Sequence, residues 1–513
     1  MHQVALNGEH LSIQDVRAVA AGARVVLQPA ARAQLVRAAA ALERAVAGGE
    51  ALYGINTGFG PFARTRIAAH EIETLQVNLL RSHAVGFGDP LPVPVVRAML
   101  VLRAHSLARG YSGVGPPIVE ALLALLNHDI APYVPEHGSV GASGDLAPLA
   151  HLGLALLGEG EVFHAGGRIP AAEALAASGL VPHRLAAKEG LALINGTQYM
   201  TARGILAAGE ATALIAAAQV AAAMSIEALL GTPRAFDPRL HALRPYPGQQ
   251  AVAANLTVML RGSEIVASHA GCDRVQDAYA LRCTPQILGA CLDVVRQVEA
   301  MLGIETDAVT DNPIVFPEDA TVISGGNFHG EPVAFGLDQL AVGVAEIGSV
   351  AERRLFRLLY NDVDRLPRCL AGRPGLESGL MLVQYLAAAL SSENRTLGHP
   401  ATLDNVVTGG GTEDHNSLGS IAAARLPRVL RNTRAIVGGE LLAAAEALDY
   451  QAPLHAAPAT AAAHAAIRAR VPRLQGDRIL AADLERLADP EFQAAIVAAV
   501  ESVLGAPLAA AAV

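Results

Sequence analysis

An apolar stripe over residues 333–355 is the feature that most constrains the fold. Its members recur at spacings of three and four: Val333, Leu337, Leu340, Val344, Ile347, Ala351 and Leu355. That spacing puts all of them on one face of a long helix, which has to be buried against other helices. Further helices are expected at residues 31–47, 94–109, 117–126, 200–230, 286–302, 380–394, 416–448, 479–488 and 491–504, with a kink at Pro427. The sequence therefore predicts a bundle of long helices.

The composition supports an all-α fold. Tryptophan is absent, aromatic residues make up 4% of the 513 residues, and alanine and leucine, which enter helices at little cost, dominate. Glycine-dense loops separate the helices of residues 1–200, long helices follow in residues 201–450, and residues 451–513 form an alanine-rich helical end. Because no Ser- or Pro-rich linker divides these regions, we treat residues 1–513 as one fold.

Charge and cysteine patterns exclude several classes of function. The formal net charge of −10 and the scattered arginines offer no basic patch for nucleic acid. Residues 211–226 are too weakly apolar to span a membrane, and the N-terminal residues lack a signal-peptide pattern, so we expect a cytoplasmic protein. The four cysteines have no C-x-x-C spacing, which predicts buried free thiols: Cys272, Cys283, Cys291 and Cys369.

Two short runs give weak signals. Gly409-Gly410-Gly411 lacks a following Lys-Ser or Lys-Thr, so we expect a flexible connection into a helix that carries Glu413 rather than a phosphate loop. His70-Glu71 lacks a second histidine four residues after the first, so no zinc-protease helix and no metal site are predicted.

The run GSVGASGDLAPLAH, at residues 138–151, carries the most distinctive chemistry. It places Ala142-Ser143-Gly144 in a Gly-rich turn before a helical segment. Gly144 has no Cβ, so its nitrogen can approach the Ala142 carbonyl in a conformation that other residues reject. Attack would close a five-membered ring, and loss of water from the ring and from Ser143 would leave a methylene conjugated with a carbonyl. The triplet alone predicts only a turn, but its surroundings favour a built-in electrophile.

The whole run resembles the signature of the aromatic amino-acid ammonia-lyase and aminomutase family. Other segments resemble family motifs in the expected order: residues 53–60 (YGINTGFG), 195–197 (NGT), 276–283 (QDAYALRC), 311–313 (DNP) and 325–328 (GGNF). The resemblance implies an all-α homotetramer with a long central helix bundle like that of fumarases and aspartases, Gly-rich catalytic loops and active sites shared between subunits. It also implies the cofactor 4-methylidene-imidazol-5-one (MIO), formed from Ala142, Ser143 and Gly144.

The resemblance also implies a role for each candidate residue. Catalytic roles fall to Tyr53, Ser143, Tyr279 and Glu413, and substrate contacts to His83, Asn195, Gln276, Arg282 and Phe328. Tyr53 is the candidate base for the β-proton, and the planar guanidinium of Arg282 suits the substrate carboxylate. Without the resemblance, each would be interpreted as a packing, surface or ion-pair residue. Either the amine or the ring of the substrate adds to the methylene in family proposals, and the sequence favours neither.

Two positions favour histidine as the substrate. Ser82-His83 is similar to the pair in histidine-specific members of the family, where members specific for tyrosine and phenylalanine carry His-Leu and Phe-Leu. Glu413-Asp414-His415 resembles the histidine-specific motif, where other members carry Gln-Asp. A carboxylate that faces an imidazole gives a strengthened hydrogen bond. The expected reaction is elimination of ammonia from L-histidine to give trans-urocanate.

Three departures keep other activities open. Thr412 stands where Gln usually precedes the Glu-Asp-His run, Asn416 stands where Val is common, and Gln198-Tyr199-Met200 enlarges the residues after the NGT motif. The alternatives are a tyrosine or phenylalanine ammonia-lyase, or an MIO-dependent aminomutase that returns the ammonia to the β-carbon. A helical scaffold without chemistry is a different class, and the presence of Ser143, Tyr53 and Arg282 argues against it.

Overall fold

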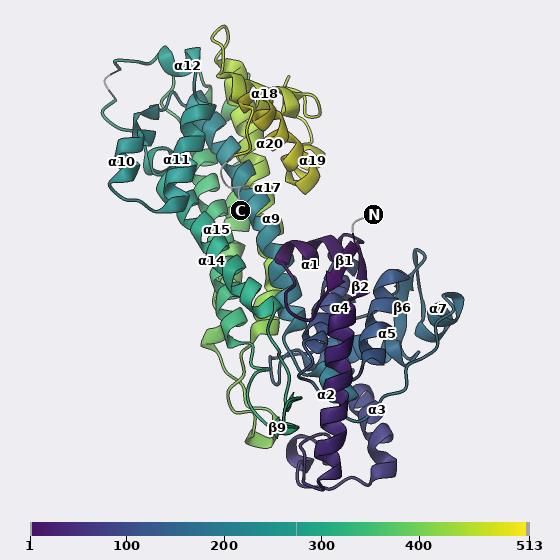
Figure 1. Ribbon diagram of the computed structural model, residues 1–513. Helices are drawn as coiled ribbons and strands as arrows, with labels where there is room; N and C mark the ends of the chain where they lie inside the picture. The colour runs from purple at the N-terminus through teal and green to yellow at the C-terminus, as the bar shows by residue number, and fades with distance from the viewer. Residues whose placement is uncertain (1–2, 273, 509–513) are drawn as a thin grey trace. The chain divides into compact units, whose positions relative to one another are not determined.

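Helices dominate the computed structural model, which describes residues 3–272 and 274–508 (Figure 1). The chain divides into two compact units, each assembled from three separate stretches. The first unit comprises residues 1–206, 299–338 and 400–424, and the second comprises residues 207–298, 339–399 and 425–513. The predicted all-α class is confirmed. The division into three consecutive regions stays a prediction, and residues 509–513 of its last region lie outside the described residues.

The first unit combines short helices with small sheets. Its helices are α1 (Ile13–Ala20), α2 (Pro29–Ala47), α3 (Ile72–His83), α4 (Val93–Ala108), α5 (Pro116–Asn127), α6 (Leu146–Leu156), α7 (Ala171–Ala177) and α8 (Glu189–Ile194), with 3-10 turns η1 (Gly60–Phe62), η2 (Ala69–Glu71), η5 (Ala401–Leu403) and η6 (Gly409–Gly411). Strands β1 (Gln3–Leu6) and β2 (Arg24–Leu27) pair in parallel. The antiparallel pairs are β3 (Phe87–Pro90) with β5 (Pro135–His137), β4 (Ala131–Pro132) with β6 (Glu161–His164), β6 with β7 (Gly167–Pro170), and β8 (Ile314–Phe316) with β9 (Thr321–Ile323).

Helix α4 lies at the centre of the first unit. Every residue from Val95 to Ala108 is buried, and the helix packs against α1, α2 and α5 (Figure 1). A helix that is buried all round needs partners for its polar side chains. Arg97 therefore donates to the Val19 carbonyl, and His105 lies 3.1 Å from the Asp307 carboxylate.

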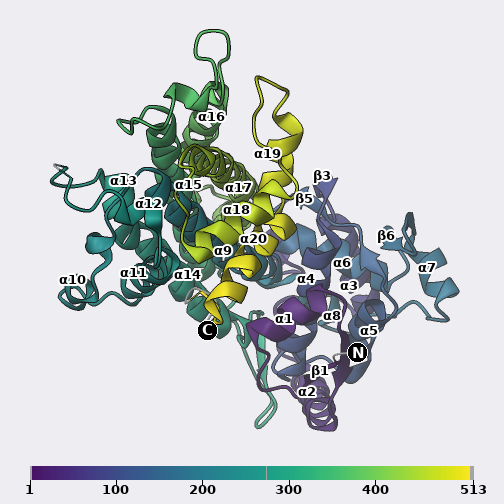
Figure 2. The same cartoon turned by 90° about the horizontal axis from the view of Figure 1, so that it is seen from above.

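Four long helices begin in one unit and end in the other: α9 (Gln198–Ala228), α14 (Thr284–Thr306), α15 (Glu331–Leu359) and α17 (Gly419–Tyr450). The remaining elements of the second unit are η3 (Pro233–Phe236), α10 (Pro238–Ala242), α11 (Pro247–Met259), α12 (Glu264–Ala267), α13 (Tyr279–Arg282), η4 (Arg368–Leu370), α16 (Met381–Leu397), α18 (Pro458–Arg468), α19 (Ala481–Ala488) and α20 (Pro490–Leu504). Helices α18 and α20 pack side by side within this unit (Figure 2).

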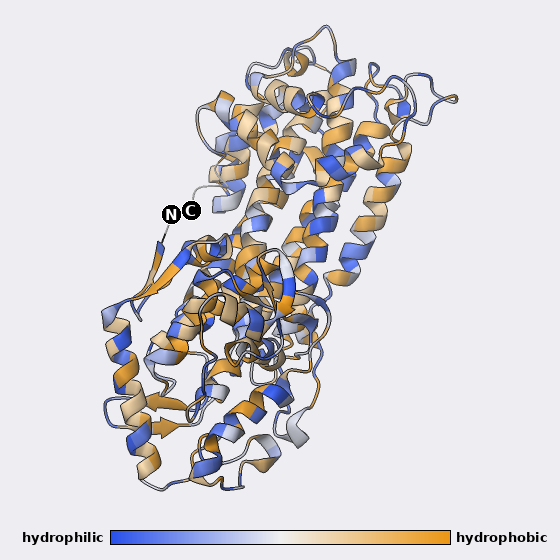
Figure 3. Ribbon diagram, turned by 90° about the vertical axis from the view of Figure 1, so that its right-hand side faces the viewer, coloured by the Kyte–Doolittle hydropathy of each residue, from blue (hydrophilic) through white to orange (hydrophobic). Residues whose placement is uncertain are grey.

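The helices predicted from periodicity are confirmed, with ends that differ by a few residues. All seven members of the 333–355 stripe are buried on α15, and apolar and polar residues alternate along the helices (Figure 3). Helix α17 continues through Pro427 to Tyr450. The prediction of buried thiols holds for Cys291 and Cys369. It is wrong for Cys272, which is exposed, and for Cys283, which is only half-buried.

Two helices, α9 and α15, are long and apolar enough to cross a membrane by length and composition alone. Within their most apolar windows, 72% and 67% of the residues are buried inside the structure. Burial against protein accounts for their apolar character, as the sequence predicted for residues 211–226.

A buried ion pair joins two of the long helices within the second unit. Arg354 on α15 donates to both carboxylate oxygens of Glu440 on α17, at 2.6 and 2.9 Å, and both side chains are fully buried. Ser225 on α9 donates to the same carboxylate at 2.7 Å. Burial raises the pKa of Glu440, and the charge of Arg354 opposes that rise. The ion pair and the Ser225 hydrogen bond together connect α15, α17 and α9.

Removal of one partner of this pair is expected to destabilise the second unit. Arg354→Met leaves the Glu440 carboxyl group buried without its cation, which costs about 3–5 kcal/mol. The double variant Arg354→Met/Glu440→Leu removes both charges and is expected to recover most of that loss. Thermal midpoints from calorimetry test this order, and a single variant as stable as the double variant contradicts it.

Candidate active site

The Ala142-Ser143-Gly144 triplet lies in a loop before α6 whose backbone is left-handed at several positions. The φ angle is +83° at Gly141, +51° at Ser143 and +81° at Gly144. A side chain at Gly144 would bring its Cβ to 2.1 Å from the Gly196 carbonyl oxygen. Only glycine permits this approach, and it lets Gly144 pair with Gly196 in an isolated bridge. The sequence-predicted turn is therefore present and closely packed.

Asp145 connects the triplet loop to two helices. One carboxylate oxygen accepts from the amides of Tyr199 and Met200 at 3.0 and 3.1 Å, and the other accepts from the Ser420 hydroxyl at 2.7 Å. Its own amide donates to the Gly196 carbonyl at 2.7 Å. Burial raises the pKa of Asp145 to about 7, although the three donors lower it. A fully buried carboxyl group with three hydrogen-bond donors thus holds the loop in place.

The N-termini of three helices lie at this loop. Helix α6 starts at Leu146, directly after Asp145, and the first amides of α9 bind the Asp145 carboxylate. Helix α17 starts at Gly419, and the amide of the preceding Leu418 donates to the Val140 carbonyl at 3.0 Å. Because a helix N-terminus carries partial positive charge, the triplet lies in a positive field.

Buried polar groups fix the Asn195-Gly196 turn that faces the triplet. Arg103 on α4 donates to the Asn195 carbonyl at 2.9 Å and to Gln198 Oε1 at 3.1 Å. Asn195 Nδ2 donates to the Asn312 carbonyl at 2.8 Å. Asn195 Oδ1 is buried and has no hydrogen-bond partner among the described residues. A buried acceptor without a partner costs about 1–3 kcal/mol, so this oxygen is suited to a bound group.

Tyr53 lies half-buried in the loop between α2 and η1. Its hydroxyl oxygen accepts from the Gly60 amide at 3.2 Å. Gln76 on α3 connects this loop to α8, because it donates to the Gly54 carbonyl and accepts from the Leu191 amide, both at 3.2 Å. Helix α8 ends next to Asn195. One buried glutamine therefore links the Tyr53 loop to the helix that positions Asn195.

His83 and Glu413, the residues that indicated histidine, lie near each other. His83 Nδ1 is 2.9 Å from the Leu79 carbonyl, which can only accept, so the neutral ring carries its proton on Nδ1 and leaves Nε2 as an acceptor. Burial lowers the pKa of His83, while the Leu79 carbonyl and the charge of Glu413 oppose that effect. The two side chains are thus close enough to interact electrostatically.

Glu413 does not lie on a helix, contrary to the prediction. It pairs with Thr408 in an isolated antiparallel bridge, and α17 begins only at Gly419. The three glycines of η6 all have positive φ angles, so they form a tight turn between Thr408 and Glu413. Turn η6 packs against η1, which follows the Tyr53 loop.

Phe328 lies half-buried in the loop between β9 and α15 of the first unit. The neighbouring His329 donates from Nε2 to the His415 carbonyl at 3.0 Å, and the two imidazole rings stack with centroids 6.2 Å apart. These contacts connect the GGNF motif to the Glu-Asp-His motif.

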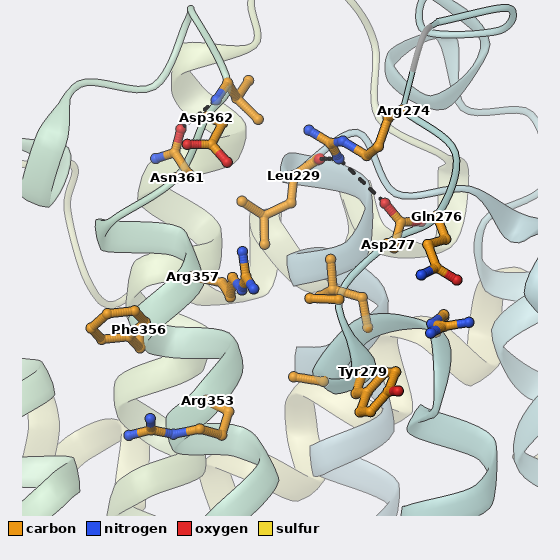
Figure 4. A pocket seen from close by; sticks show the side chains of 15 residues that line it. Leu229, Arg274, Gln276, Asp277, Tyr279, Arg353, Phe356, Arg357, Asn361 and Asp362 are labelled. Atoms are coloured by element: carbon orange, nitrogen blue, oxygen red, sulfur yellow. Dashed lines mark hydrogen bonds and ion pairs between the residues drawn. The ribbon is translucent and has the colours of Figure 1, made fainter.

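Gln276, Tyr279 and Arg282 belong to the second unit, where they line a cavity of about 720 Å³. The Arg282 guanidinium lies 4.7 Å from the centroid of the Tyr279 ring, and the Tyr279 side chain is 70% exposed. Figure 4 shows Arg353, Phe356 and Arg357 of α15 on one side of this cavity and Gln276 and Tyr279 on the other. The arginines make the cavity suitable for an anionic group.

Four buried or half-buried residues of the first unit contribute to this arrangement although the sequence reasoning assigned them no role: Asp145, Arg103, Gln76 and Thr408. Only Asp145 carried a signal, because it directly follows the triplet. Arg103 and Gln76 contact partners far along the chain, which no local pattern indicates. Thr408 contacts Glu413 five residues away, but the turn that brings the two together was not predicted.

Comparisons with known proteins agree with this geometry. The sequence model of the aromatic amino acid lyase family matches residues 11–469. The chain is 51% identical to a histidine ammonia-lyase of Symbiobacterium thermophilum over 499 residues, which is 97% of this chain and 98% of the relative. The chain belongs to the aromatic amino acid lyase family. The predicted enzyme class, a carbon–nitrogen lyase, is confirmed by the same findings.

Solved structures of the family show the same fold. The crystal structure of histidine ammonia-lyase from Trypanosoma cruzi is 38% identical and covers 99% of this chain and 96% of its own, with a TM-score of 0.90. A tyrosine aminomutase from Streptomyces globisporus is 36% identical and covers 98% of this chain and 99% of its own, with a TM-score of 0.91. Family members with different activities therefore share this architecture.

The Asp145 carboxyl group is expected to control the stability of the first unit in a pH-dependent way. Asp145→Asn leaves one acceptor oxygen for three donors, which costs about 1–3 kcal/mol. Because the pKa of Asp145 is raised to about 7 in the folded protein, its contribution to stability is greatest at low pH and is lost as the pH rises through 7. The loss of thermal midpoint in the variant should therefore be larger at pH 5 than at pH 8. An equal loss at both values contradicts the assignment.

Proposed function

We propose that the protein is a histidine ammonia-lyase that eliminates ammonia from L-histidine to give trans-urocanate, with MIO formed from Ala142, Ser143 and Gly144. The observation that carries the proposal is the left-handed triplet loop in the same unit as the neighbouring His83 and Glu413 side chains. The names of the relatives support the substrate, since the Symbiobacterium and Trypanosoma proteins are both histidine ammonia-lyases.

The residues around the triplet fit the cofactor. Gly144 and Gly196 leave no room for side chains, the φ angle of Ser143 is positive, and the buried Asn195 Oδ1 lacks a partner among the described residues. MIO would supply an electron-poor carbon that converts the substrate amine into a better leaving group. Asp145 and the N-termini of α6, α9 and α17 would hold the loop and supply the positive field that favours such a group.

The chain's own residues account for the remaining steps of an elimination. Tyr53 would accept the β-proton at its phenol oxygen once that oxygen has given up its own proton and is released from the Gly60 amide. Arg282 would bind the substrate carboxylate with two parallel hydrogen bonds, and Gln276 and Tyr279 would bind beside it. His83 Nε2 and the Glu413 carboxylate both accept hydrogen bonds, so either can bind the N–H group of an imidazole ring.

We also propose that the active protein is a homotetramer with shared sites. Gln276, Tyr279 and Arg282 belong to a different unit from the triplet, and the family resemblance implies sites that combine loops of several subunits. Large apolar side chains are exposed on two helices of the second unit: Val342 and Phe356 on α15, and Leu382, Tyr385 and Leu386 on α16. A second copy of the chain would cover them. A cytoplasmic location remains a prediction from the N-terminal sequence.

A tyrosine aminomutase activity is the second candidate. The similarity to the Streptomyces aminomutase supports it, because its fold agrees as closely as that of the Trypanosoma lyase. The Thr412 and Asn416 departures lie beside Glu413 and keep this candidate open. The accumulated product distinguishes the two, since a mutase yields a β-amino acid.

The cofactor assignment predicts a loss of mass. The purified active protein should weigh two water molecules less than its sequence requires, because ring closure and Ser143 each release one. Ser143→Ala should fold, keep the water that Ser143 would lose, and have almost no activity, since alanine has no hydroxyl to eliminate. Intact-mass spectrometry measures this directly, and an active protein with the full sequence mass refutes the assignment.

The substrate assignment predicts a change of selectivity. The triple variant Ser82→Phe/His83→Leu/Glu413→Gln should lose activity on histidine and gain relative activity on phenylalanine, because a site built for polar rings leaves buried groups unpaired with apolar ones. Ultraviolet absorbance of the conjugated acid reports each reaction. A native protein that converts tyrosine or phenylalanine faster than histidine overturns the histidine assignment and leaves the cofactor assignment intact.

A further inference from the structure

The three-glycine turn η6 folds Thr408 back onto Glu413. The φ angles of Gly409, Gly410 and Gly411 are +56°, +65° and +91°, which only glycine adopts readily in succession. The Thr408 amide donates to the Glu413 carbonyl at 3.0 Å, so the two residues face each other across the turn. The glycine run therefore forms a defined tight turn, which neither a phosphate loop nor a flexible connection would require.

The Thr408 side chain contacts the Glu413 carboxylate directly. Its hydroxyl donates to Glu413 Oε2 at 2.7 Å. A Cβ on Gly409 would lie 2.8 Å from the same carboxyl group. One carboxylate oxygen is thus bound on one side and closely packed on another, which restricts rotation of the carboxylate and leaves Oε1 for another donor.

Asn416 determines the direction of the Thr408 hydroxyl. Asn416 is 4% exposed, and its Nδ2 donates to the Val406 carbonyl at 2.7 Å and to Thr408 Oγ1 at 3.3 Å. An amide nitrogen can only donate and an ionised carboxylate can only accept. The hydroxyl between them must therefore accept from Asn416 and donate to Glu413, so each of the two hydrogen bonds enforces the other.

We propose that Thr408 is a positioning residue for Glu413, and that the chain of hydrogen bonds Asn416 to Thr408 to Glu413 fixes the carboxylate for the imidazole ring of the substrate. The inference rests on the proposed histidine ammonia-lyase function. It assigns a role to Asn416, which departs from the residue common in the family, and to the glycine run. A fixed carboxylate binds a ring N–H without first losing rotational freedom, whereas an apolar ring gains nothing from it.

Two unreactive probes separate positioning from simple structural support. Imidazolylpropionate and phenylpropionate both carry the substrate carboxylate but lack the amine, so they bind without turnover. Their dissociation constants are measured by calorimetry with the full-length protein and its Thr408→Val and Thr408→Ser variants. Thr408→Val should weaken imidazolylpropionate by about tenfold, the typical effect of a lost hydrogen bond to a charged group. Phenylpropionate should bind Thr408→Val with the native affinity. Thr408→Ser keeps the hydroxyl and should bind imidazolylpropionate with the native affinity.

A matched control is Thr412→Val, the same chemical change at an exposed side chain four residues away. It should leave the binding of both probes as in the native protein. In a Glu413→Gln background, Thr408→Val should have a much smaller effect, because the two residues act as one group. If Thr408→Val does not fold, Thr408→Ala gives the same test, since it also removes the hydroxyl that binds Glu413, and Thr412→Ala is then its control.

The outcomes distinguish this inference from the proposed function. Equal weakening of both probes by Thr408→Val, no weakening of either, or the same loss in Thr412→Val overturns the positioning role. A native protein that does not convert histidine overturns the proposed function itself, and the inference with it. A native protein that converts histidine while Thr408→Val retains its preference for the imidazole probe overturns the inference alone.

Discussion

Burial of the Asp145 carboxyl group is the constraint on which the active-site unit depends. A carboxyl group without solvent needs donors, and Asp145 obtains them from the start of α9 and from Ser420 on α17. Its partners are 54, 55 and 275 residues away along the chain. The triplet loop is therefore held in its left-handed conformation by segments that only the fold brings together.

The candidate residues of the active site are divided between the two units. The triplet, Tyr53, His83, Asn195, Phe328 and Glu413 belong to the first unit, whereas Gln276, Tyr279 and Arg282 belong to the second. In the homotetramer proposed above, loops that flank the long helices of one copy would supply groups to the site of a neighbouring copy. Tyr279, which is 70% exposed, would be one of them.

Periodicity predicted the long helices because their burial is one-sided and regular, as the 333–355 stripe on α15 illustrates. Motif resemblance identified the triplet loop and the enzyme family, since those residues are contiguous in the sequence. The small sheets escaped prediction because strands of two to four residues are too short to show a period of two. Arg103 escaped because its hydrogen bonds reach Asn195 and Gln198, which only the fold brings near. Thr408 escaped because its hydrogen bond to Glu413 depends on the tight turn of the three glycines, which the sequence analysis took for a flexible connection.

The electrostatics of the first unit agree with an electron-poor group at the triplet. Arg103 is fully buried, its pKa is lowered to about 10, and its hydrogen-bond partners among the described residues are neutral oxygens. Lys188 is buried 2.7 Å from Asp311. Arg103 and Lys188 therefore share the Asp311 carboxylate as their nearby negative charge. Together with the helix N-termini, these cations favour negative charge near the triplet. The carboxyl groups of Asp145 and Glu305 lie in the same region and partly offset that effect.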